Sequence, residues 1–228
     1  MLISINPDNP QPRSIKQIAD KLRSGAVICY PTDTVYGIGC DIFNQKAIKR
    51  IFQIKKRPTH KPFSFMCSSL KNVSDYAHVS NMAYRIMRKA LPGAFTFILP
   101  AAKIVPKIMI TKQKTVGIRV PQNNICLDLI EALGNPVLTT SAILDKEGPP
   151  LSEAYEFEEL WGNKVDLVID GGMVYPDPST IVDFSGDEPE ILRAMQELLD
   201  YLGYKSELAA NGKKGLEEYQ ASSTRTQS

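Results

Sequence analysis

The sequence predicts an α/β or α+β fold, because short apolar segments alternate with segments of helical periodicity along the chain. The 228 residues, 43% of them hydrophobic, are enough for one large domain with its own core. No apolar run reaches the roughly 18 residues that a membrane-spanning helix needs. We therefore expect one domain over residues 1–204, followed at 205–228 by a flexible tail in which Ser, Gly and charged residues accumulate.

Apolar side chains at helical spacing predict five helices. Residues 13–24 place their apolar side chains on one face, and Gly25 is the expected end of that helix. Residues 44–56 begin at Asn44, a candidate N-cap, and Pro58 limits their far end. The other predicted helices cover 81–91, 124–133 and 153–161.

Short apolar runs, most of them containing β-branched residues, predict eight strands. The last run could also contain the start of a helix. The predicted strands are 26–30, 62–67, 94–99, 115–120, 136–142, 165–170, 180–184 and 190–195.

Charge is distributed unevenly along the chain, although the formal net charge is only +2. Residues 42–127 contain 16 Lys and Arg and a single acidic residue, whereas residues 128–228 contain 7 basic and 20 acidic residues. A basic stretch of this length indicates either an anionic partner or pairing with the acidic part of the folded chain. Both interpretations stay open at this point.

A run of cations follows the second predicted helix. Lys55, Lys56 and Arg57 repel one another unless an anion lies among them, and Lys61 is close in sequence. Favourable interaction with the helix dipole explains one of these cations. If the chain turns at Pro58, Lys55 or Arg57 can point into a cleft, where ammonium and guanidinium groups bind phosphates and carboxylates.

Two further arginines lie in predicted strands, Arg119 in GIRVP and Arg193 in EILRAM. An arginine among apolar neighbours is rarely left without a partner. Each therefore either binds a ligand or forms a structural salt bridge, and we keep both as candidate binding residues.

Small hydroxyl side chains gather where predicted strands begin or end. Thr32 follows the first strand, Thr139 and Ser141 end the fifth, and Ser179 precedes the seventh. Ligands of sheets with helical crossovers collect outside strand ends, so these hydroxyls are candidate binding groups. Ser and Thr are also common turn residues, which is the competing interpretation.

Motifs for several other chemistries are missing from the sequence. There is no GxxxxGK[ST] phosphate loop, no GxGxxG after the first strand, and no His- or Cys-rich metal constellation. Cys29 and Cys67 lie in apolar runs and are expected to be buried thiols in a reducing, cytoplasmic compartment. The N-terminus does not read as a signal peptide. Without a nucleophile, catalysis would depend on positioning and charge neutralisation.

Taken together, residues 10–195 resemble the YrdC/Sua5 family of threonylcarbamoyl-AMP synthases. The similarity is carried by YPTDTVYGIGCD, the KxR triplet with its proline, KP, GAFTFIL, GIRVP, TTSA, PSTIVD and ILR. It implies a twisted mixed sheet flanked by helices, with a large, basic, concave cleft. It also implies synthesis of threonylcarbamoyl-AMP and pyrophosphate from L-threonine, bicarbonate and ATP, for t6A modification of tRNA, and an association with double-stranded RNA and tRNA.

The resemblance also implies roles for individual residues. Lys55 and Arg57 would cover the triphosphate and, with Ser141, would form the catalytic set. The hydroxyls would surround threonine and the acyl phosphate. Mg²⁺ would arrive on the phosphates of ATP, without a metal site on the protein. The residues expected to bind substrate or nucleotide are Thr32, Lys61, Arg119, Thr139, Ser179 and Arg193.

Three departures from the family pattern resemble its YciO branch. The SxN signature ends in Ile143, the family's histidine position holds Met66, and Ala194-Met195 replace a glycine. Losing an amide and an imidazole costs roughly 1–3 kcal/mol each in hydrogen bonding. Three hypotheses follow: a synthase with weak activity, a paralogue that acts on a related carbamoyl-adenylate or nucleotide, including by hydrolysis, or an RNA-binding module without synthase chemistry. The sequence does not indicate an oligomeric state.

Overall fold

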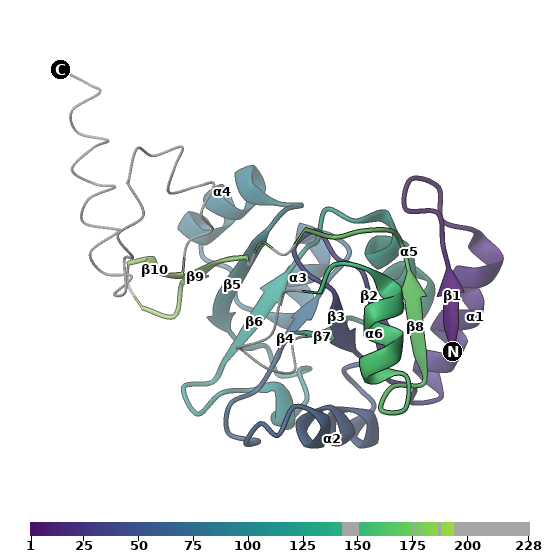
Figure 1. Ribbon diagram of the computed structural model, residues 1–228. Coiled ribbons are helices and arrows are strands. Elements are labelled where there is room, and N and C mark those ends of the chain that lie inside the picture. The colour runs from purple at the N-terminus through teal and green to yellow at the C-terminus, as the bar shows by residue number, and fades with distance from the viewer. Residues whose placement is uncertain (143–150, 176, 178, 187, 194–228) are drawn as a thin grey trace, which may run out of the picture.

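The computed structural model describes residues 1–142, 151–175, 177, 179–186 and 188–193. Within these residues, strands and helices alternate along much of the chain, as the sequence predicts (Figure 1). The helices are α1 (Pro12–Arg23), α2 (Gln45–Ile54), α3 (Leu70–Tyr76), α4 (Asn81–Ala90), the 3-10 helix η1 (Lys107–Met109), α5 (Asn124–Leu133) and α6 (Ala154–Trp161). The strands are β1 (Leu2–Ser4), β2 (Ile28–Tyr30), β3 (Gly37–Gly39), β4 (Ser64–Met66), β5 (Phe95–Pro100), β6 (Thr115–Arg119), β7 (Val137–Ser141), β8 (Leu167–Asp170), β9 (Thr180–Asp183) and β10 (Glu190–Arg193).

The strands form one mixed sheet in the order β1-β8-β2-β3-β7-β4-β6-β5-β9-β10. Figure 1 shows this sheet running through the molecule, with β1 at one edge and β10 at the other. Parallel pairs, such as β2 with β8 and β4 with β6, alternate with antiparallel pairs, such as β3 with β7. The expected mixed α/β sheet flanked by helices is confirmed.

Two apolar clusters hold the helices on the sheet. Side chains of α2, α3, α4 and α6 belong to the larger cluster, which includes Phe65, Phe97 and Leu138 from the central strands. Side chains of α1 and α5 belong to the smaller cluster, together with Tyr30 and Met66. Residues two apart on a strand point to the same face of the sheet. Met66 and Val137 of the smaller cluster therefore share a face with Ser64, Thr139 and Ser141, which line a pocket beside the cluster.

Local signals place the helix ends close to the predicted positions. Asn44 caps α2, because its side chain accepts a hydrogen bond from the backbone N–H of Ala47. The helix ends at Ile54, two residues before the predicted end, and Lys56 has a φ of 46°. This left-handed backbone conformation of Lys56 turns the chain away from the helix axis. Gly134 caps α5 with a φ of 77°, as the sequence predicts.

Some expectations fall outside the described residues. The predicted tail at 205–228, and the boundary at residue 204, belong to this group, as do Ile143, Ala194 and Met195. The run 190–195 is a strand, β10, as far as Arg193. Among the described helices, none is long and apolar enough to cross a membrane.

Candidate functional site

A pocket of about 300 Å³ opens on the uncovered part of the sheet face. Hydroxyl groups dominate its wall, two guanidinium groups face it, and a few apolar side chains complete it. Its lining residues are Thr32, Thr34, Val35, Gly37, Arg57, Pro62, Phe63, Ser64, Thr96, Arg119, Thr139, Thr140, Ser141, Ser179 and Ile181.

The strand register explains why these polar side chains meet. Ser64 on β4 pairs with Thr139 on β7, and Ser141 pairs with Gly37 on β3. Because side chains alternate between faces, Thr139 and Ser141 share a face, and paired neighbours share it with them. The site therefore occupies the face of the sheet. Thr32, Ser141 and Ser179 stand at strand ends, as the sequence predicts, and the register brings them together on one face of the sheet.

Gly39 shows how closely the wall is packed beside this pocket. A Cβ atom at Gly39 would collide with the carbonyl oxygen of Leu138 and would lie 2.9 Å from the ring of Tyr30. Tyr30 is fully buried, and its hydroxyl donates to the Leu138 carbonyl at 3.3 Å. The glycine thus makes room for Tyr30, which belongs to the core and does not line the pocket.

The hydroxyl of Thr32 organises the turn after β2. Its oxygen accepts hydrogen bonds from the backbone N–H groups of Thr34 at 3.1 Å and Val35 at 3.2 Å. It also donates to the carbonyl of Val35 at 2.6 Å. Thr32 is 4% exposed and lines the pocket, so the turn interpretation and the pocket interpretation both hold for this residue.

A second pair of hydroxyls joins two other strands at the pocket. Thr96 of β5 lies 2.9 Å from Ser179, measured between the two side-chain oxygens, and both residues are buried. Like Arg119, Thr96 is a polar residue within an otherwise apolar strand. The polar residue within the apolar run AFTFIL is the sequence signal that points to Thr96.

Arg119 is buried and held by the turn after β2. Its guanidinium forms an ion pair with Asp33 at 2.7 Å and donates to the hydroxyl of Thr34 at 2.9 Å. The side chains of Arg119 and Asp33 are each 8% exposed. Asp33 also accepts from the backbone N–H of Gln122 at 3.1 Å. The Nε of Arg119 is buried and has no hydrogen-bond partner among the described residues.

Arg57 and Lys55 approach the pocket from the segment after α2. Arg57 donates from Nε to the carbonyl of Lys61 at 2.7 Å, and its guanidinium lies 4.8 Å from the centre of the Phe63 ring. Lys55 donates from Nζ to the carbonyl of Ser141 at 2.9 Å. Burial and the neighbouring Arg57 charge lower the pKa of Lys55 to about 8.

The pocket brings together six of the nine residues that the sequence analysis singled out. These six are Thr32, Arg57, Arg119, Thr139, Ser141 and Ser179. Lys55 contacts the pocket through Ser141. The side chain of Lys61 is exposed and does not line the pocket, although its carbonyl fixes Arg57. Arg193 lies on edge strand β10, and its side chain is outside the description.

Thr34 and Thr140 belong to the same hydroxyl-rich strand ends as Thr32 and Thr139, whereas two polar lining residues, Ser64 and Thr96, were not predicted. Ser64 lies at the pocket because β4 pairs with β7 in a register that sets it opposite Thr139, and Thr140 lies there because it is near the end of β7. A single sequence gives little information on register, because pairing joins segments far apart in the chain.

Ion pairing explains only part of the basic stretch. Within the described residues, Arg50 pairs with Asp166 at 2.5 Å, which joins this stretch to the acidic end of the chain. Arg119 pairs instead with Asp33 near the N-terminus. Mutual neutralisation with the acidic end therefore applies to Arg50, and an anionic partner for the rest of the basic stretch stays a prediction.

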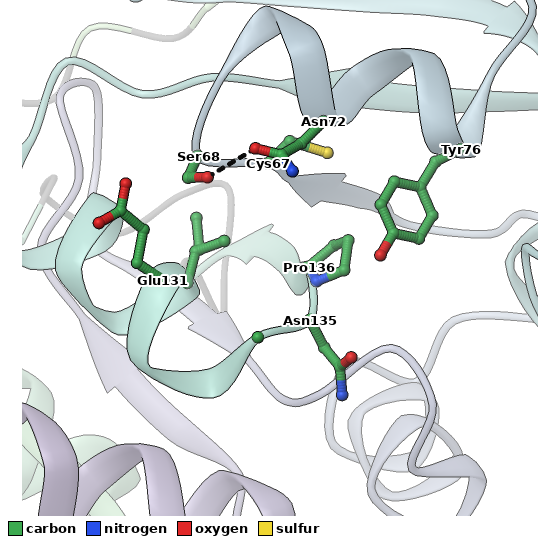
Figure 2. Close-up of a pocket in the computed structure, with 9 residues that line it drawn as sticks. Cys67, Ser68, Asn72, Tyr76, Glu131, Asn135 and Pro136 are labelled. Atoms are coloured by element: carbon green, nitrogen blue, oxygen red, sulfur yellow. Dashed lines mark hydrogen bonds between the residues drawn. The ribbon is translucent and has the colours of Figure 1, made fainter.

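A second pocket, of about 350 Å³, lies at the opposite ends of β4 and β7 (Figure 2). Figure 2 shows Ser68 donating to the side chain of Asn72, at 2.9 Å, with the ring of Tyr76 across the opening. Glu131 is the charged residue of its described lining. A carboxylate without a cation disfavours anionic ligands, and none of the predicted residues line this pocket. We therefore assign the candidate site to the first pocket.

All four cysteines are free and buried, as predicted for Cys29 and Cys67. Burial is the main cause that raises the pKa of each thiol. Among the described residues, no group of three or more His, Cys, Asp and Glu side chains could hold a metal ion.

The fold and the pocket define an α/β protein that binds a small ligand on a sheet face. The Sua5/YciO/YrdC family model, described as "Telomere recombination", matches residues 20–194. The chain belongs to this family.

Two relatives match most of the chain. An uncharacterized protein of Haemophilus influenzae is 44% identical over 191 residues, covering 83% of this chain and 92% of the relative. YciO of Escherichia coli K12, also uncharacterized, is 42% identical with the same coverage. The crystal structure of E. coli YciO superposes with a TM-score of 0.81 at 40% identity, over 86% of this chain and 96% of YciO. The resemblance to the YciO branch is confirmed.

Named synthases are more distant. The threonylcarbamoyl-AMP synthase of Coxiella burnetii is 33% identical over 160 residues, which cover 70% of this chain and 86% of that enzyme. Pyrococcus abyssi Sua5, crystallised in complex with L-threonine, has a TM-score of 0.79 at 28% identity. That match covers 89% of this chain but only 61% of the Pyrococcus protein.

Proposed function

We propose that this chain is a threonylcarbamoyl-AMP synthase-like enzyme, which converts L-threonine, bicarbonate and ATP to threonylcarbamoyl-AMP and pyrophosphate. The observation that carries the proposal is the meeting of two guanidinium groups, from Arg57 and Arg119, with a wall of hydroxyls in one pocket. The complex of the related Sua5 with L-threonine supports the choice of amino acid.

The reaction needs placement and charge neutralisation more than a protein nucleophile. A carbamate oxygen of N-carboxythreonine forms a bond to the α-phosphorus of ATP, and the bond from that phosphorus to pyrophosphate breaks. Lys55 and Arg57 would neutralise the phosphates, and Mg²⁺ would enter on their oxygens. The guanidinium of Arg119, which lines the pocket, suits a carboxylate or phosphate oxygen. The hydroxyls of Ser141 and Ser179 would orient the amino acid.

Threonine-dependent pyrophosphate release tests the proposal. The full chain is incubated with Mg²⁺, ATP and bicarbonate, with or without L-threonine, and the released pyrophosphate is measured. Release that requires both threonine and bicarbonate is the expected result. A folded protein that releases none, or releases the same amount without threonine, would exclude the synthase.

A second candidate is a paralogue that hydrolyses a nucleotide or a carbamoyl-adenylate. The sequence departure at Met66 supports it, because this residue stands where the synthases that the chain resembles have a histidine. Met66 is 1% exposed within the smaller core cluster and does not line the pocket, so its effect on the site would be indirect. Turnover of supplied threonylcarbamoyl-AMP or ATP, without threonine-dependent pyrophosphate release, would select this candidate.

Binding of double-stranded RNA or tRNA is proposed as an accompanying property. It is supported by the basic stretch at 42–127, in which Lys56 and Lys61 are exposed beside the pocket. Phosphate contacts of this kind weaken steeply as salt increases. An RNA affinity that is insensitive to salt would contradict the proposal.

A further inference from the structure

Trp161, the single tryptophan of the chain, lies directly behind Lys55. It is the last residue of α6 and is fully buried. Its indole N–H donates to the carbonyl of Ala142 at 3.1 Å. The Nζ of Lys55 lies 5.9 Å from the centre of the indole ring. The ring thus contacts both the ammonium and the chain that follows Ser141.

The end of β7 is held by these two side chains. Lys55 binds the carbonyl of Ser141 at 2.9 Å, and Trp161 binds the next carbonyl along the chain. Two consecutive peptide groups are therefore fixed, one by Trp161 of α6 and one by Lys55, the C-cap residue of α2. Fixing these peptides also fixes the position of the Ser141 side chain at the pocket.

We propose that Trp161 is a positioning residue, which holds the Lys55 ammonium and the Ser141 peptide in the geometry that an anionic substrate group requires. A lysine side chain has many rotamers, and an indole face attracts an ammonium group. The indole therefore limits where the ammonium lies before any ligand binds. The assignment of ATP as the anion rests on the proposed function.

Trp161 could instead act only as core packing, because it belongs to the larger apolar cluster. The two roles differ in one measurable respect. A packing residue affects ligand binding independently of Lys55, whereas a positioning residue acts through Lys55. Two residues that act through one interaction give non-additive effects.

A double-mutant cycle measures this coupling. Mg·ATP binding is measured by calorimetry for the wild type, Trp161→Phe, Lys55→Met and the double variant. Phenylalanine keeps an apolar ring and removes the N–H donor. We expect each single change to weaken binding roughly five- to twentyfold, and the double variant to lose less than the product of the two single losses, because part of the Trp161 effect acts through Lys55. Effects that multiply in the double variant would overturn the proposal.

Lys164 provides the matched control. Its Nζ also lies 5.3 Å from the centre of the Trp161 ring, but it donates to the carbonyl of Leu160 within α6 and not to β7. Lys164→Met removes a cation from the ring and leaves the Lys55 contacts in place. Binding within about twofold of the wild type is expected. A loss of affinity equal to that of Lys55→Met would mean that Lys55 has no special role among the cations near the ring, which would contradict the proposal.

Tryptophan fluorescence tests the contact without ATP and without changing Trp161. The pKa of Lys55 is lowered to about 8, whereas burial raises the pKa of Tyr36 and of the cysteines above that range. The emission of Trp161 should therefore change with a midpoint near that pH, and the change should vanish in Lys55→Met. A wild-type protein without this transition contradicts the proposal. If the transition is present but ATP does not bind, the proposed function fails and the positioning contact stands.

Discussion

The ammonium of Lys55 donates a hydrogen bond to the carbonyl oxygen of Ser141 at 2.9 Å. This contact joins the C-cap residue of α2 to the last residue of β7, although the two are far apart in sequence. It brings the cationic run and the TTSA segment, two separate sequence signals, into contact at the edge of the pocket. The lysine reaches this position at the cost of partial burial, which lowers its pKa to about 8.

The affinity for Mg·ATP should fall as pH rises through about 8. In the proposed function Lys55 would bind phosphate in its protonated form, and this form is populated below the lowered pKa and lost above it. We expect a loss of up to about tenfold between about pH 7 and about pH 9, measured by calorimetry. Lys55→Met should bind weakly at both values, with little change in melting temperature. An equal pH dependence in this variant would assign the titration to another group.

The buried pair of Arg119 and Asp33 should show strong coupling in stability. Asp33→Asn leaves the guanidinium buried with its ion pair removed, so we expect a loss of about 3–5 kcal/mol in the free energy of unfolding. In the double variant with Arg119→Met no charge is left uncompensated, and the loss should be smaller than the sum of the single losses. Urea denaturation measures all four proteins. Strictly additive losses would show that the pair is not coupled.

Local signals in the sequence predict most of the helices and strands. Asn44, Gly25 and Gly134 mark helix ends through capping and positive φ, which depend on neighbouring residues only. The strand β3 was missed because Gly37 and Gly39 have low strand propensity. They form a strand by pairing with β2 and β7, and at Gly39 the ring of Tyr30 and the Leu138 carbonyl occupy the space that a side chain would need.

The residue types of the candidate pocket and their place at strand ends follow from the sequence, whereas the sheet face on which they meet does not. Arg119 stands out as a polar residue in an apolar strand. It forms the salt bridge that was one of its two predicted roles, and ligand binding stays a prediction for this pocket-lining residue. The placement of Ser64 opposite Thr139 depends on strand register, which is set by contacts between distant segments. Because a single sequence does not record that pairing, the sheet-face location could not be derived from it.

Gly39→Ala should destabilise the fold. The added methyl group would collide with the Leu138 carbonyl and press on the ring of Tyr30, neither of which has room to move within the core. Overpacking of this kind costs about 1–3 kcal/mol. Gly186→Ala is the control, since its Cβ would meet only the carbonyl of Glu188 at 3.8 Å. Urea denaturation should show a clear loss for the first change and under about 0.5 kcal/mol for the second. Equal losses would mean that the close approach at Gly39 relaxes freely.

Met66→His would restore the histidine of the family pattern, and it tests whether that residue alone separates this chain from the named synthases. Met66 is 1% exposed, packs in the smaller core cluster, and is not among the pocket-lining residues. A buried imidazole without a partner costs about 1–3 kcal/mol, so we expect a lower free energy of unfolding than for the control Met66→Leu. Threonine-dependent pyrophosphate release should stay at or below the wild-type rate, because Met66 does not face the pocket. A clear rise in that rate, at unchanged stability, would show that the imidazole reaches the substrate and that its loss is what distinguishes this chain.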